Sequence, residues 1–209
     1  MTRLRILCLS LLALCLATPA LADTIYDNGP TNGETDAWQI NQGHVVSDTF
    51  TVGGGGASID GLSFAAWLEP GEVVLAAEVS ITSNEFGGTT YFDQLVTFTQ
   101  GSCTTNQYGY NVCVETASFS PVNLAGGAYW VNLQNAESSD SPIYWDENSG
   151  PSLASENELG TIPSESFTLF GTNGSTTTTG TVPEPASVML LGSGILGLAG
   201  WLRRNRRLL

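Results

Sequence analysis

Carboxylates are the residues of this chain whose type and number could do chemistry. The sequence has twenty Asp and Glu residues against six Lys and Arg residues. Two carboxylates at a fixed separation are enough for glycoside hydrolysis, with one acting as general acid and the other as nucleophile or base. Clustered carboxylate and amide oxygens also bind calcium, and Asp146, Glu147 and Asn148 are consecutive. The sequence therefore predicts either a calcium site at these three residues or a solvated acidic face.

Three tryptophans are the candidate ligand-binding residues. Trp67 and Trp130 lie in predicted strands in which apolar and polar residues alternate. Each falls on the side opposite the main apolar residues of its strand, which are Leu62, Phe64 and Leu68 for Trp67 and Tyr129, Val131 and Leu133 for Trp130. Trp145 lies in another predicted strand, next to Tyr144. An exposed indole on a β-sheet can stack on a sugar ring, while neighbouring acids and amides bind the hydroxyls. Packing in the core is the alternative for all three, because aromatic side chains are mostly buried.

Cys103 and Cys113 are the cysteines that remain after the first 22 residues. An even count in an exported chain predicts a disulfide between them. His44 is the one histidine in the sequence, and no G-x-S-x-G motif accompanies it. We therefore expect no nucleophilic triad and no catalytic residue, and we predict that the protein is not an enzyme.

The distribution of charge excludes several classes of partner. The segment 23–171 contains nineteen of the twenty acidic residues and no Lys or Arg. Its net charge near neutral pH is therefore about −19, counting one negative charge per carboxylate. Such a surface repels nucleic acid, phosphorylated ligands and anionic lipid, and it attracts cations. We expect no nucleic-acid partner and no cofactor apart from calcium.

Alternation of apolar and polar residues predicts strands in this acidic segment. One face of 59–68 carries Leu62, Phe64, Ala66 and Leu68, and the segment 72–82 alternates in the same way from Val73 to Ile81. Six further strands are expected at 45–52, 89–100, 111–120, 128–135, 142–146 and 166–171. Gly- and Pro-rich turns separate them. The prediction for 23–171 is an all-β domain, an antiparallel β-sandwich of jelly-roll type.

The N-terminal residues 1–22 have the three parts of a secretory signal peptide. Arg3 and Arg5 precede an apolar run from Ile6 to Ala17, and Ala20 and Ala22 form the small-x-small cleavage site. The apolar run is about 12 residues long, which is too short to span a bilayer. The Sec export machinery and signal peptidase are therefore expected partners.

The C-terminal residues form a second targeting segment. Residues 172–182 are rich in Thr and Gly and predict a linker. The sequence Val182-Pro183-Glu184-Pro185 then precedes a 17-residue apolar run, 186–202, which as a helix is about 25 Å long and at the short end for a transmembrane span. A basic cluster of Arg203, Arg204, Arg206 and Arg207 follows, and it predicts a cytoplasmic stop-transfer tail.

This order of motif, apolar span and basic cluster in 183–209 resembles the PEP-CTERM sorting signal of exported Gram-negative proteins. The resemblance implies that an exosortase-type membrane protease is a partner. It also implies a precursor anchored in the inner membrane that is delivered to the cell envelope or the exterior. An ordinary single-span anchor that stays uncleaved is the alternative.

The resemblance implies no activity for the segment 23–171. The leading interpretation is a non-enzymatic structural or adhesive module of an exopolysaccharide-rich envelope or biofilm matrix, with a polysaccharide as its ligand. The alternative from another functional class is a secreted glycoside hydrolase that uses a carboxylate pair.

Overall fold

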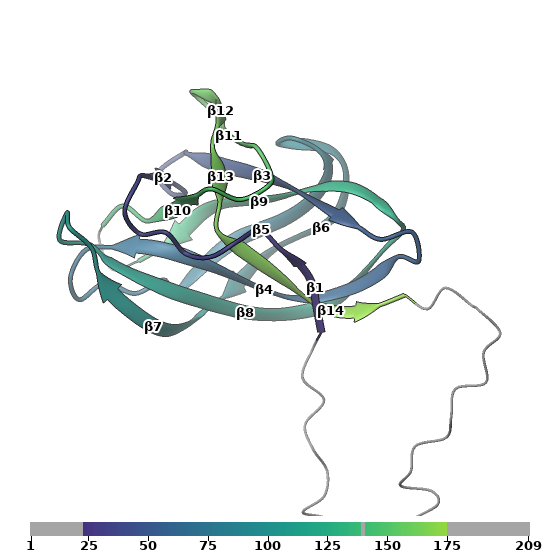
Figure 1. Cartoon of the computed structure of the whole chain (residues 1–209), viewed down its shortest axis with the longest axis horizontal. Helices are drawn as coiled ribbons and strands as arrows, with labels where there is room; N and C mark the ends of the chain where they lie inside the picture. Colours follow the sequence, from purple (N-terminus) through teal and green to yellow (C-terminus); the bar gives the residue numbers. More distant parts are fainter. Residues whose placement is uncertain (1–22, 139–140, 175–209) are drawn as a thin grey trace, which may run out of the picture. The chain divides into compact units, whose positions relative to one another are not determined.

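A computed structural model describes residues 23–138 and 141–174, which form two antiparallel β-sheets (Figure 1). These described residues contain no helix, and so none of them forms a helix that could cross a membrane. The predicted signal peptide, most of the linker and the predicted C-terminal helix lie outside the described residues. The fold below is therefore that of the acidic segment.

The larger sheet has eight strands and is organised around β4. On one side β4 pairs with β8, and on the other side it pairs first with β14 and then with β10. The remaining four strands extend the sheet, with β1 on β14, β7 on β8, and both β2 and β13 on β10. The strands are β1 (Asp23–Asp27), β2 (Ala37–Gln39), β4 (Ala57–Leu68), β7 (Thr99–Thr105), β8 (Asn111–Leu124), β10 (Tyr144–Asn148), β13 (Ser164–Glu165) and β14 (Phe167–Asn173).

The smaller sheet has six strands in the order β12-β11-β3-β9-β5-β6. Its centre is β9, which pairs along its length with β3 and with β5. The strands are β3 (Val45–Val52), β5 (Ala76–Asn84), β6 (Gly87–Thr97), β9 (Gly127–Glu137), β11 (Ala154–Glu156) and β12 (Gly160–Ile162). Figure 1 shows β11 and β12 as a hairpin that projects from the sheet.

One apolar cluster fills the space between the two sheets. It contains Phe64 of β4 together with Phe50 of β3 and Leu133 of β9, all almost without exposed area. The predicted antiparallel sandwich is thus confirmed, because each sheet buries one alternating face. The described strands form sheets of eight and six, and the jelly-roll detail stays a prediction.

The predicted strand 72–82 needs one correction at its start. β5 begins only at Ala76, and Val73 and Leu75 are 38% and 52% exposed, whereas Val74 is buried. From Ala77 onward the predicted inward face is correct. The apolar alternation runs past the end of the sheet, so periodicity alone placed the strand start four residues too early.

Several carboxylates of the acidic segment are enclosed by the fold. Asp48 has no exposed area and accepts hydrogen bonds from the Glu165 and Thr49 backbone N–H groups (2.8 and 2.6 Å) and from Asn28 Nδ2 (3.0 Å). Burial still raises its pKa to about 6. Glu165 is also fully buried, and within the described part of the chain neither of its carboxylate oxygens has a hydrogen-bond partner. Burial first, and then the charge of Asp48, raise the pKa of Glu165 well above its usual value.

Glu115 is a third enclosed carboxylate, and it lies on β8 of the larger sheet. It pairs in register with Phe64 and has no exposed area. Gln100 Nε2 donates to Oε1 at 3.3 Å, while Oε2 has no partner among the described residues. Burial raises the pKa of Glu115 to about 7. Because a buried charge without a cation is costly, these carboxyls are held best in their neutral form.

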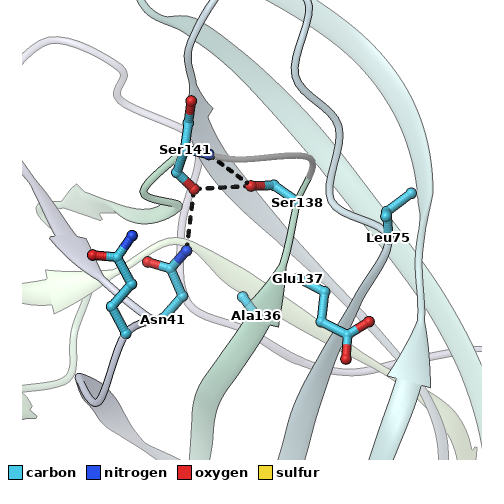
Figure 2. Close-up of a pocket in the computed structure, with 7 residues that line it drawn as sticks. Asn41, Leu75, Ala136, Glu137, Ser138 and Ser141 are labelled. Atoms are coloured by element: carbon cyan, nitrogen blue, oxygen red, sulfur yellow. Dashed lines mark hydrogen bonds between the residues drawn. The ribbon is translucent and has the colours of Figure 1, made fainter.

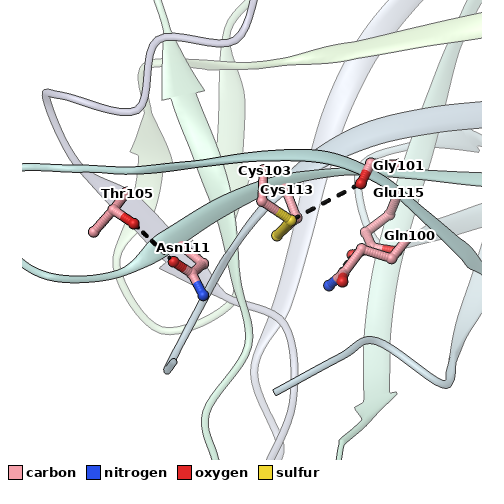
Figure 3. Close-up of a disulfide and its surroundings, with 7 residues drawn as sticks. All are labelled: Gln100, Gly101, Cys103, Thr105, Asn111, Cys113 and Glu115. Atoms are coloured by element: carbon pink, nitrogen blue, oxygen red, sulfur yellow. Dashed lines mark hydrogen bonds between the residues drawn. A yellow bond between two sulfur atoms is a disulfide. The ribbon is translucent and has the colours of Figure 1, made fainter. Parts of the chain in front are cut away.

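The predicted disulfide is confirmed, and it joins Cys103 of β7 to Cys113 of β8. The two residues are direct cross-strand neighbours in the β7–β8 register. Figure 3 shows the bond beside Gly101, with Gln100 and Glu115 farther along the same strands. β7 is an edge strand that pairs only with β8 in this sheet, so the bond fastens an edge to the core.

Replacing both cysteines by alanine should lower the free energy of unfolding by about 2–3 kcal/mol. The reason is that the loop between Cys103 and Cys113, a sequence separation of 10, is then no longer closed in the unfolded chain. Urea denaturation of the oxidised protein and of the double variant measures the difference. Unfolded protein from the envelope should show no free thiol at either position. Equal stability of the two proteins would contradict a structural role for the bond.

Lowering the pH from 8 to 5 should raise the melting temperature. Asp48 and Glu115 have folded pKa values of about 6 and about 7, above the usual values of 3.8 and 4.5 for these side chains. The folded state therefore holds these protons more tightly, and their stabilising contribution is complete at low pH and lost as the pH rises through the folded values. Glu115→Gln, which cannot ionise, should flatten the dependence near pH 7. Glu34→Gln, at an exposed acid, is the control, and equal slopes for the two variants would refute the assignment.

Candidate functional site

The structure separates the three candidate tryptophans. Trp145 has no exposed area and donates from Nε1 to the Ser166 carbonyl at 2.8 Å, so it is a core residue and is removed from the ligand-binding set. Trp67 faces away from the main core as predicted, yet it is 5% exposed because Tyr108 stacks on it with ring centroids 5.8 Å apart. Trp130 is half-buried and remains available at the surface.

Asp146, Glu147 and Asn148 do not converge on a common point. They are consecutive residues of β10, and successive side chains of a strand point to opposite faces. Two of the three side chains already accept hydrogen bonds. Asp146 accepts from Trp67 Nε1 at 2.6 Å, and Glu147 accepts from Trp38 Nε1 at 3.2 Å. Within 23–138 and 141–174, no three Asp, Glu, His or Cys side chains form a group that could hold a metal ion.

The outer face of the six-stranded sheet, meaning the side turned away from the apolar core, carries a different set of polar residues. On β9 the core-facing residues Val131 and Leu133 alternate with Trp130, Asn132 and Gln134. Registered neighbours on β3 and β5 continue these rows across the sheet. The three rows are Thr49–Trp130–Thr82, Ser47–Asn132–Ser80 and Val45–Gln134–Glu78.

Asn132 is the centre of this outer face. Its Oδ1 accepts from Ser47 Oγ at 2.5 Å and from the Phe86 backbone N–H at 3.3 Å. Its Nδ2 donates to Ser80 Oγ and Thr82 Oγ1, each at 3.0 Å. Although Asn132 is 2% exposed, its hydrogen bonds are therefore satisfied, and it fixes the hydroxyls of two neighbouring strands. The contact to Phe86 also draws the β5–β6 hairpin over the face.

A small hollow lies on the outer face beside Asn132. Its volume is about 110 Å³, and it is lined by Val45, Ser80, Phe86, Asn132, Gln134 and Asn157. Phe86, from the hairpin, is 39% exposed and forms an aromatic wall. Asn157 is held from the β11–β12 side, since its Oδ1 accepts from the Val45 N–H at 2.9 Å. The lining of this hollow thus includes three amide side chains and one hydroxyl.

A larger hollow of about 380 Å³ lies where β9 ends (Figure 2). It is lined by Asn41, Gln42, Leu75, Ala136, Glu137, Ser138 and Ser141. Figure 2 shows Asn41 on one side, tied by its Nδ2 to the Ser141 carbonyl at 3.2 Å, with Leu75 and Glu137 across from it. Glu137 and Gln42 are exposed and present a carboxylate and an amide to solvent.

Glu78 connects the part of β9 that lies between the two hollows. Its two carboxylate oxygens accept from Gln134 Nε2 and from Asn135 Nδ2, both at 2.7 Å. Asp93 of β6 is nearby, and burial together with the charge and hydrogen bond of Glu78 raises the pKa of Asp93. Acids and amides therefore alternate along this stretch of the outer face.

The chemistry offered by the outer face is hydrogen bonding to a neutral polar ligand, with Trp130 and Phe86 as surfaces for stacking. Amides can both donate to and accept from hydroxyl groups. Sequence reasoning singled out Trp130 but missed Asn132, Gln134 and Phe86. The alternation of Asn132 and Gln134 with Val131 and Leu133 was the signal for the two amides. Phe86 had no such signal, because a hairpin and its contact to β9 bring it there.

Comparison with known families gives a match only at the C-terminal end. Residues 181–207 match the model of the PEP-CTERM protein-sorting motif, in agreement with the resemblance seen in the sequence. No curated protein matches the chain. The motif marks the protein as one that is exported, membrane-anchored before processing, and processed by an exosortase, a membrane protease.

Proposed function

We propose that this is a non-enzymatic protein of the cell envelope or extracellular matrix, which exosortase cleaves and which binds polysaccharide through the outer face of the six-stranded sheet. The observation that carries the proposal is the outer face itself. The half-buried Ser80 and Gln134 and the exposed Asn135 stand there, beside the half-buried Trp130 and the exposed Phe86. Ser47, Asn132 and Thr82 of the same registered rows are buried and hold these groups in place. Hydroxyl-rich sugar rings match both kinds of group.

The sorting motif supports a destination at or beyond the cell surface, where polysaccharide is an abundant ligand. The disulfide supports the same destination, because such bonds persist in oxidising compartments. A biofilm or exopolysaccharide matrix is the environment that we propose. The Sec machinery and signal peptidase are the proposed export partners.

The hydrogen bonds of Glu78 support a binding protein over a glycoside hydrolase. Both of its carboxylate oxygens already accept from amides, those of Gln134 and Asn135, at 2.7 Å. A glycosidase needs two carboxyl groups at a set separation, one to transfer a proton and one to act as nucleophile or base, and an amide-bound carboxylate fits neither role. Calcium remains a proposed ligand of the acidic segment, without an assigned site.

Replacing Pro183, Glu184 and Pro185 by alanine should leave a precursor retained in the membrane, because the protease motif is lost. The wild-type protein from its native host should begin near Asp23 and lack the segment after the motif. Intact-mass spectrometry with and without the processing protease makes the comparison. Normal release of the triple variant would reject the sorting mechanism.

The mature wild-type protein should bind insoluble or immobilised polysaccharide, and Trp130→Ala should lower the affinity about fivefold or more, equivalent to the ~1 kcal/mol of an aromatic contact. Pull-down on the exopolysaccharide of the native host measures this. Leu159→Ala, at an exposed leucine of the β11–β12 hairpin, is the control. Release of reducing ends that is abolished by Glu78→Gln would instead establish the glycoside hydrolase.

A further inference from the structure

We propose that the two hollows and the stretch of β9 between them form one continuous track that binds a linear, uncharged polysaccharide lengthwise. This inference rests on the proposed polysaccharide-binding function and specifies both the site and the class of ligand. The track is defined by the larger hollow at Gln42 and Glu137, the bridge at Glu78 and Asn135, and the smaller hollow at Phe86.

Backbone conformation singles out the track independently of its side chains. Among the described residues, the non-glycine residues with positive φ are Gln42 (56°), Asn135 (49°) and Phe86 (55°). Gln42 lines the larger hollow, Phe86 lines the smaller one, and Asn135 lies on β9 between them. Left-handed conformation is unfavourable for side chains such as Gln and Phe, and such residues concentrate at functional sites.

A β-bulge makes the track continuous. Glu78 pairs with Gln134 and Ala76 pairs with Glu137, so β9 has two residues where β5 has one. The extra residue brings two successive amides, those of Gln134 and Asn135, to the same carboxylate of Glu78. Without the bulge, neighbouring side chains of β9 would point to opposite faces.

The length of the track fits a chain of several sugars. From Asn132, which lines the smaller hollow, to Ser138, which lines the larger one, the backbone covers six residue steps, or about 20 Å at ~3.3 Å per residue, which is about four pyranose rings at roughly 5 Å each. The bridge between the hollows carries the amides of Gln134 and Asn135. A ligand lying along β9 would contact all three parts.

Charge specifies an uncharged ligand. The track carries Glu78 and Glu137, with Asp93 beside it, and the segment 23–171 has no Lys or Arg to pair with an anionic sugar. A uronate or sulfate group placed here would lose water without gaining a cation and would be repelled by the three carboxylates. Hydroxyl and N-acetyl groups carry no such penalty, because the carboxylates accept their O–H and N–H donors.

Glycine substitutions at the three left-handed positions test the track. Gln42→Gly, Asn135→Gly and Phe86→Gly each remove a side chain while suiting the backbone, so the melting temperature should stay equal or rise. The probes are β-1,4-glucan, β-1,3-glucan and N-acetylglucosamine oligosaccharides of two to eight units, with oligogalacturonate as the charged probe. Isothermal titration calorimetry gives the affinities, and Leu159→Ala is the control.

The expected result is that one neutral series binds with an affinity that rises up to about four units and then levels off. Each glycine variant should weaken binding of the long oligosaccharides at least fivefold, and oligogalacturonate should bind at least tenfold more weakly. Binding that plateaus at two units, or that survives both Gln42→Gly and Asn135→Gly, overturns the track. The proposed function then stands if Trp130→Ala still weakens binding to the host exopolysaccharide, and it falls too if no polysaccharide binds.

Discussion

The fold has to enclose carboxylates without any lysine or arginine to neutralise them. Nineteen acids and no such base occur between residues 23 and 171, so each enclosed carboxyl depends on N–H and O–H donors or on its own proton. Asp48 represents the first solution, with backbone and Asn28 donors around it. Glu165 and Glu115 represent the second, because they have oxygens without hydrogen-bond partners in the part of the chain that the structure describes.

The same shortage of cations shapes the outer face. Where another protein would place lysine or arginine to hold an acidic side chain, this one uses amides, as Gln134 and Asn135 do for Glu78. Such a surface keeps its order through hydrogen bonds that are insensitive to salt compared with ion pairs. On the polysaccharide binding that we propose, such a surface favours a neutral hydroxyl, which finds donors and acceptors there, over an anion, which the carboxylates repel.

The sequence predicted the parts of the structure that depend on local periodicity. Leu62 and Phe64 share the inward face of β4 as alternation requires, and the cysteine count predicted the disulfide. The accessibility of Trp67 could not be predicted, since Tyr108 covers it from a distant part of the chain. The outer-face site depended on register between β3, β9 and β5, on a bulge and on a hairpin contact through Phe86. These are long-range features that no window of sequence contains.

The last strand of the domain has a consequence for the order of assembly. β14 ends at Asn173 and lies between β1 and β4, so the first strand of the chain has no place in the sheet until the last one arrives. Contacts of such high sequence separation form slowly, because the entropy of closing the loop is lost before the contact is gained. The larger sheet is therefore complete only when the residues shortly ahead of the matched sorting motif are available for pairing.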